Sequence, residues 1–155
     1  MRKIVVDTNL LVLLVVGLTD RTLITKHKRT RSFELADFDL LTQFLSNFDE
    51  VVVTPHILTE ASNLVSQIGE PILSAVRHTF STLLETQREE FQPSHIVANH
   101  NLFIRLGLTD CAVLNLVKDK TPLITVDLDL YLAAAATNSN AENFNHLRAA
   151  RLLSV

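Results

Sequence analysis

Short apolar runs alternate with longer amphipathic stretches along most of the chain. Three of these runs are rich in β-branched residues, which predicts buried strands at 4–6, 51–53 and 122–126. The stretches between them repeat apolar residues with the period of a helix. Helices are therefore predicted at about 9–16, 33–48, 55–68, 71–87, 109–119 and 128–136, and Gly17 is expected to end the first of them.

Two stretches have weaker patterns. Residues 91–107 contain Ile96-Val97, which fits either a short strand or a segment of loop and helix. Near the C-terminus, Asn138 to Glu142 predicts a polar turn, and Asn143-Phe144 is expected to belong to a last short strand. Residues 147–153 follow as a terminal helix or tail.

The alternation of strands and helices predicts an α/β protein with three α/β/α layers, in which helices cover both faces of a parallel sheet. A chain of 155 residues suits one domain, 1–155, that can bury a sizeable core. Right-handed crossovers would bring the C-terminal ends of the parallel strands to one edge. Polar residues that follow the strands are therefore the first candidates for a functional site.

Acidic residues occur where this edge is expected. Asp7 follows the first strand, and Asp127 and Asp129 follow the third. Glu60 lies inside a predicted helix, and Asp110 lies in the first turn of another, which Thr109 is expected to cap. Each acid also has a purely structural explanation, as a helix cap, a solvent-exposed side chain or an anion that stabilises a helix dipole.

Convergence of these acids would have a chemical consequence. Four carboxylates within a few Å of each other repel, and a divalent cation removes that penalty. Ligation by oxygen alone favours one or two Mg²⁺ or Mn²⁺ ions over zinc, and Asp129 is either an additional acid of the site or a replacement for Asp127 as ligand. Such an ion can orient a water of lowered pKa against a phosphodiester. The neighbouring Thr8, Asn9 and Thr125 suit hydrogen bonds to the ligands or to water.

Charge is distributed unevenly along the chain. The formal net charge is -3, but residues 21–31 contain five cations and no acid, so the rest of the chain carries -8. This basic segment is either an ordinary solvated loop or a surface that binds a polyanion. In the second case, the residues expected to bind RNA phosphates are Lys26, Lys28, Arg29 and Arg31.

The single cysteine, Cys111, excludes an internal disulfide framework and a cysteine-rich zinc site. It is expected to be a small core residue rather than a nucleophile. The longest apolar run near the N-terminus, Leu10 to Leu18, is shorter than the ~20 residues that span a bilayer. A cytoplasmic protein without a membrane partner is therefore expected.

Four segments together resemble the PIN-domain family in order, spacing and local context. They are Val6-Asp7-Thr8-Asn9, Thr54 to Glu60, Leu106 to Asp110 and Leu123 to Asp129. The resemblance implies a parallel sheet of four or five strands and a ribonuclease that depends on Mg²⁺ or Mn²⁺. By position it assigns catalysis and metal ligation to Asp7, Glu60, Asp110 and Asp127, with Asn9 as a polar auxiliary and Thr125 positioning Asp127 or a water.

Many small PIN proteins are the toxins of toxin–antitoxin pairs, so the resemblance also implies an RNA substrate and an antitoxin partner. Whether the chain forms a homodimer stays open. Two other functions are compatible with the residues. One is a non-catalytic PIN-like module that binds RNA or protein. The other is an aspartate-based phosphohydrolase of the haloacid-dehalogenase type, although Asn9 stands where that chemistry usually needs a second acid.

Overall fold

The computed structural model describes residues 1–138 and 140–154 of the chain. Its strands are β1 (Lys3–Val6), β2 (Glu50–Val53), β3 (Arg88–Glu89), β4 (Leu123–Thr125) and β5 (Ala141–Asn143). Its α-helices are α1 (Thr8–Thr19), α2 (Leu35–Leu45), α3 (Pro55–Val65), α4 (Ile72–Leu84), α5 (Ser94–Val97), α6 (Phe103–Leu116), α7 (Leu128–Ala135) and α8 (Phe144–Leu153). Two short 3₁₀ helices, η1 (Arg21–Leu23) and η2 (Val117–Asp119), complete the described elements.

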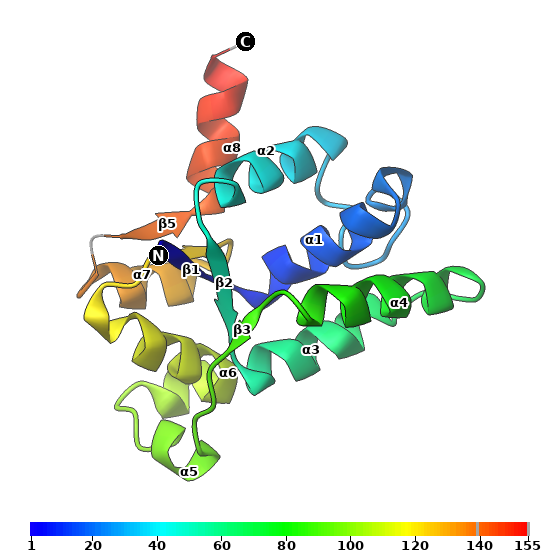
Figure 1. Ribbon diagram of the computed structural model, residues 1–155. Coiled ribbons are helices and arrows are strands. Elements are labelled where there is room, and N and C mark those ends of the chain that lie inside the picture. Colours follow the sequence, from blue (N-terminus) through cyan, green and yellow to red (C-terminus); the bar gives the residue numbers. More distant parts are fainter. Residues whose placement is uncertain (139, 155) are drawn as a thin grey trace.

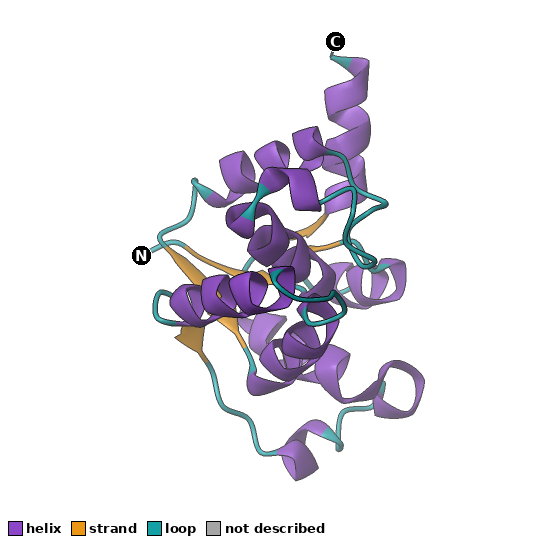
Figure 2. Ribbon diagram, turned by 90° about the vertical axis from the view of Figure 1, so that its right-hand side faces the viewer, coloured by secondary structure: helices purple, strands orange, loops and turns teal. Residues whose placement is uncertain are grey.

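All five strands form one parallel sheet in the order β3-β2-β1-β4-β5. Helices α1 to α4 cover one face of the sheet, and α6 and α7 lie on the other (Figure 1). Figure 2 looks onto the first helical layer, with the sheet behind it. The three-layer α/β/α fold with a parallel sheet is therefore confirmed.

The strand order follows from the crossovers. From β1 the chain steps outward to β2 and then β3, whereas β4 returns to the other side of β1 and leads to β5. Right-handed connections place the helices of these two halves on opposite faces. The stepping direction reverses between β1 and β4, and ligands bind at such a point in open α/β sheets, beyond the carboxyl ends of the strands.

Helix α1 lies at the centre of the core and is longer than its sequence predicts. Its residues from Leu10 to Gly17 are all buried, as are Ile4 to Val6 of β1. The prediction that Gly17 ends this helix is wrong, because Gly17 is an interior residue against the ring of Phe38. The missing side chain allows α2 to pack closely on α1, so this glycine serves packing rather than termination.

Several weakly patterned segments also differ from prediction. Ile96 and Val97 belong to helix α5, so the strand alternative is wrong and the helical one holds. Strand β3 was not predicted, because its two residues are charged and exposed. The predicted turn 138–142 includes Ser139, which lies outside the described residues, and its last two positions belong to β5. Phe144 begins α8 instead of extending that strand.

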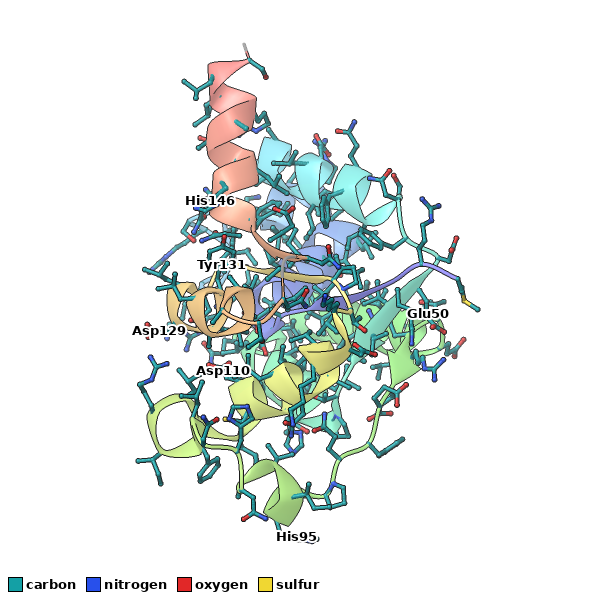
Figure 3. All side chains as sticks on the ribbon, turned by 90° about the vertical axis from the view of Figure 1, so that its left-hand side faces the viewer. Glu50, His95, Asp110, Asp129, Tyr131 and His146 are labelled. Atoms are coloured by element: carbon teal, nitrogen blue, oxygen red, sulfur yellow. The ribbon has the colours of Figure 1, made fainter. Side chains whose placement is uncertain are left out.

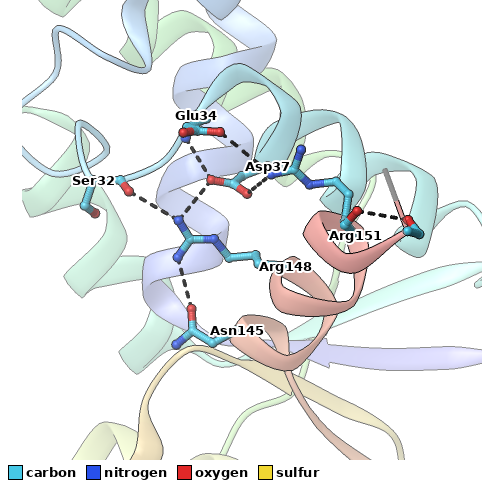
Figure 4. Close-up of polar contacts among 7 residues, drawn as sticks. Ser32, Glu34, Asp37, Asn145, Arg148 and Arg151 are labelled. Atoms are coloured by element: carbon cyan, nitrogen blue, oxygen red, sulfur yellow. Dashed lines mark hydrogen bonds and ion pairs between the residues drawn. The ribbon is translucent and has the colours of Figure 1, made fainter.

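Helix α8 is attached to α2 by one buried acid. Asp37, only 1% exposed, accepts hydrogen bonds from Arg148 at 3.0 Å and Arg151 at 3.3 Å (Figure 4). The other carboxylate contact is local, from the backbone N–H of Glu34 at 2.8 Å, which completes a capping box at the start of α2. The carboxylate of Asp37 thus caps the start of α2 and binds two arginines of α8.

Among the described residues, no helix combines the length and the apolar character that a bilayer crossing requires.

Candidate functional site

The carboxyl ends of β1 and β4 meet at the point where the strand order reverses. Asp7 directly follows β1, and Asp127 follows β4 after one intervening residue. Asp7 donates its backbone N–H to the carbonyl of Ile124 at 3.2 Å, so the two chain segments are still paired where the acids begin. The fold therefore brings together two acids that are 120 positions apart in sequence.

Asp7 is a buried acid, with 4% of its surface exposed. Its carboxylate accepts hydrogen bonds from the N–H of Thr8 at 2.7 Å and from the hydroxyl of Thr125 at 2.6 Å. Burial raises the pKa of Asp7, and the nearby carboxylates of Asp127 and Glu60 add to the rise, whereas the two hydrogen bonds oppose it. Asp7 also caps α1, a role that leaves its other lone pairs available.

Thr125, fully buried at the end of β4, lies between the two strand-end acids. Its hydroxyl donates to Asp7 and accepts a hydrogen bond from the N–H of Asp127 at 2.9 Å. Asp127 in turn caps α7 by accepting from the N–H of Leu130 at 3.0 Å. One hydroxyl therefore fixes the carboxylate of Asp7 and the backbone that carries Asp127.

Asp110 lies on α6, just beyond a break in that helix. Gly107 has φ 84° and ψ -175°, so the helix restarts after it. The prediction that Thr109 caps this start is wrong, because Thr109 lies two residues beyond the break. Asp110 is half-buried, and its pKa is raised to about 7, first by burial and then by the charges of Asp7, Asp127, Glu60 and Asp129.

The remaining predicted residues surround these three acids. Glu60 and Asp129 are exposed on α3 and α7, and Asn9 is exposed in the first turn of α1. Thr8 is buried, and its hydroxyl oxygen has no hydrogen-bond partner among the described residues. Figure 3 shows Asp110 and Asp129 on the neighbouring helices α6 and α7.

The acids of this site form no ion pair with a cationic side chain in the described part of the chain. Within residues 1–138 and 140–154, no Lys, Arg or His forms an ion pair with any of the five carboxylates, Asp7, Glu60, Asp110, Asp127 and Asp129. The oxygen-only donor set, the raised pKa values and the unpaired Thr8 hydroxyl fit a hard divalent cation in their chemistry. In the same described residues, however, no three Asp, Glu, His or Cys side chains form a ready-made metal-binding group. Ligation would therefore require these side chains to draw closer together.

The basic segment lies away from the acids. Residues 21–31 follow the C-terminal end of α1, whereas Asp7 caps its N-terminal end. The 12 residues of α1 span about 18 Å at 1.5 Å per residue, which separates the two regions. Lys26, Lys28 and Arg31 are exposed, and Arg29 donates to Gln67 at 2.6 Å. The fully buried His27 contacts Arg29 and Val65, which anchors the segment to α3.

A second polar feature was missed from the sequence. Glu60 lines an open hollow of about 490 Å³ together with His56, Thr59 and Asn63 of α3. Ser94 and Thr109 complete its polar lining from two other helices. The helical spacing of the four α3 residues places them on one face, so the sequence could have revealed this polar stripe. It could not have revealed the hollow, because Ser94 and Thr109 are distant from α3 in sequence.

No protein-family model matches this chain, and no curated protein matches it. The resemblance to PIN domains therefore depends on the order, spacing and local context of the four sequence segments alone.

Proposed function

We propose that this protein is a metal-dependent endoribonuclease of the PIN type, which hydrolyses phosphodiester bonds of RNA. The observation that carries the proposal is the set of five carboxylates around the β1/β4 reversal point, none of which forms an ion pair with a cation within residues 1–138 and 140–154. Burial, and after it repulsion by the other carboxylates, raises the pKa of Asp7 and Asp110, and a bound cation would relieve this penalty on the charged forms.

One or two Mg²⁺ or Mn²⁺ ions would be held by Asp7, Glu60, Asp110 and Asp127, with Asp129 as a further ligand. When bound, such an ion supplies a water of lowered pKa and positive charge beside the phosphate. Thr125 would keep Asp7 and Asp127 in register, because its hydroxyl contacts both residues. Asn9 is exposed beside Asp7 and would offer its amide to substrate or water.

RNA cleavage tests this proposal. Purified protein is expected to cut single-stranded RNA internally with Mg²⁺ or Mn²⁺, and EDTA or Asp7→Asn should abolish the cleavage. Asp39→Asn is the matched control, because Asp39 is an exposed acid that pairs with Arg21 at 2.6 Å. Cleavage that survives both EDTA and Asp7→Asn would disprove the proposal.

A second candidate is a non-catalytic PIN-like module that binds RNA or protein. The described side chains favour it in one respect, because they do not form a ready-made metal-binding group. Mn²⁺ binding without cleavage of varied RNAs would favour this candidate. The toxin of a toxin–antitoxin pair is the more specific form of the nuclease proposal, and co-purification with the product of an adjacent small reading frame would support it.

A further inference from the structure

A hollow of about 540 Å³ lies between α6 and α7, and none of the five acids lines it. Its apolar lining includes Leu114, Leu132 and Ala133, and its polar lining includes His100, Arg105 and Lys118. Pockets of this size and mixed character commonly hold small organic groups. None of the residues that line it is acidic.

The two cations of this hollow are available for a ligand. Arg105 and Lys118 are exposed, and neither forms an ion pair within the described residues 1–138 and 140–154. His100 accepts a hydrogen bond from the N–H of Leu102 through Nδ1 at 3.0 Å, which leaves Nε2 to carry the proton of the neutral ring. Burial and the nearby charge of Lys118 lower the pKa of His100.

The hollow begins close to the acidic site. On α6, Leu114 follows Asp110 by four residues, and on α7, Leu132 follows Asp129 by three. Both spacings are about one helical turn, a rise of about 5 Å. Asp129 lies in the first turn of α7 and Asp110 lies near the middle of α6, so both acids are on the pair of helices that encloses the hollow (Figure 3).

We propose that this hollow binds one nucleotide of single-stranded RNA, next to the phosphodiester that reaches the acids. Arg105 and Lys118 bind its phosphate, and the aliphatic lining formed by Leu114, Leu132 and Ala133 contacts its base. The charge pattern supports this placement of the strand, because a polyanion is attracted to Arg105 and Lys118 and needs a metal ion only at the carboxylates. The inference rests on the proposed nuclease function for the identity of the polymer.

Binding without cleavage provides the first test. A fluorescently labelled single-stranded RNA is titrated into the full chain in EDTA, and anisotropy gives the affinity at several salt concentrations. The double variant Arg105→Ala/Lys118→Ala should bind at least about 10-fold more weakly and reduce the salt slope by about 0.7, since both cations neutralise one phosphate and each neutralised phosphate of a single strand contributes about 0.7. Arg77→Ala, an exposed cation of α4 that contacts Ser66, should change neither value. Unchanged affinity in the double variant, or an equal loss in Arg77→Ala, would overturn the inference.

The imidazole of His100 provides a second test that needs no variant. Uridine 5′-monophosphate should produce a saturable NMR shift of the His100 ring and raise its pKa, because an anion nearby favours the charged ring. The exposed His78 of α4 should not respond. Inorganic phosphate at the same concentration should cause a smaller shift, since it lacks a base to contact the aliphatic lining. An equal response to both ligands, or no response, would contradict a nucleotide site.

The outcomes separate this inference from the proposed function. RNA cleavage that is normal in kcat and KM for Arg105→Ala/Lys118→Ala would disprove the nucleotide site and leave the nuclease intact. RNA binding at the hollow by a protein that never cleaves RNA would disprove the nuclease and leave the nucleotide site intact.

Discussion

The hydroxyl of Thr125 donates a 2.6 Å hydrogen bond to the carboxylate of Asp7, across the point where the strand order of the sheet reverses. Both residues are buried, so the bond joins the ends of β1 and β4 away from water. It also links the two strand-end acids, because the same hydroxyl accepts from the N–H of Asp127. This geometry makes Thr125 the residue through which the site can be perturbed without removing a carboxylate.

Thr125→Val is expected to weaken both the site and the fold. It keeps the side-chain shape but leaves the carboxylate of Asp7 without its hydroxyl donor, at a cost of about 1–3 kcal/mol in the free energy of unfolding. Loss of this support should reduce metal affinity or RNA cleavage about 10–100-fold. Denaturant titration and a cleavage assay measure the two effects. Thr125→Ser retains the hydroxyl and should remain near wild type, and a Ser variant as impaired as the Val variant would contradict this role.

The raised pKa of Asp110 predicts that this group stabilises the folded state more at low pH than at high pH. Its pKa is about 7 in the folded state against 3.8 for an ordinary aspartate, so the folded state binds this proton more tightly. The resulting stabilisation is complete below about pH 3.8 and is lost as the pH rises through about 7. In EDTA, the contribution of this group should therefore favour folding at about pH 5 over pH 8 by about 1–2 kcal/mol, after allowance for partial exposure.

Denaturant unfolding of wild type and Asp110→Asn at the two pH values isolates that contribution. The Asn variant should be more stable than wild type at pH 8, because it removes a charge that four other carboxylates repel. Metal affinity should follow the opposite trend, since ligation needs the ionised form and should weaken below about pH 7. An Asn variant with the same pH dependence as wild type would show that Asp110 is not the titrating group.

Gly17→Ala tests the packing of α1 on α2. A methyl group at this position would overlap the ring of Phe38, which is itself buried. Overpacking should cost about 1–3 kcal/mol and exceed the roughly 1 kcal/mol that alanine usually gains over glycine inside a helix. Gly17→Ala/Phe38→Leu should recover part of the loss in denaturant titrations. A more stable Gly17→Ala protein would contradict the close packing.

Asp37→Ala tests the attachment of α8. It leaves Arg148 and Arg151 without their buried partner and removes half of a capping box, so the free energy of unfolding should fall by about 3–5 kcal/mol. Limited proteolysis should then cut earliest within α8. Asp39→Ala, on the same helix but in an exposed ion pair, should cost less than about 1 kcal/mol. Equal losses from both variants would argue against the buried cluster.

RNA binding by the basic segment, residues 21–31, can be tested separately. If residues 21–31 bind RNA phosphates, neutralising Lys26, Lys28 and Arg29 together should weaken RNA binding and reduce its salt slope by about 2. The distance of about 18 Å along α1 means that such contacts would lie well away from the acids. Cleavage of short RNAs should therefore change less than binding of long ones, and an unchanged salt slope would assign the segment to solvent.

The sequence predicts those parts of the fold in which a run of apolar residues is enough to require burial. Strands β1, β2 and β4 consist mostly of Val, Ile and Leu, and the parallel sheet forces Asp7 and Asp127 to its carboxyl edge. Strand β3 could not be predicted, because Arg88 and Glu89 are exposed charged residues, which join the sheet through backbone pairing with β2 and an ion pair between Arg88 and Glu50. The length of α1 was missed because the role of Gly17 depends on Phe38, a contact that no local pattern shows.

The candidate site also combines features that the local sequence shows with features that depend on tertiary contacts. The acids could be predicted from their places along the chain, but their exposure and partners could not. The hydrogen bond from Thr125 to Asp7 exists only because β4 pairs with β1. The hollow between α6 and α7 likewise depends on how these two helices pack. Features shared by several elements need the tertiary structure, even when each residue is visible in the sequence.

Calorimetric titration of the metal-free protein with Mn²⁺ is the most direct test of the proposed metal centre, because it asks whether the five carboxylates bind metal together. We predict saturable binding of one or two ions, weakened at least about 10-fold by either Asp7→Asn or Asp110→Asn and unchanged by Asp39→Asn. Absence of Mn²⁺ binding, or binding that neither site variant weakens, would contradict it.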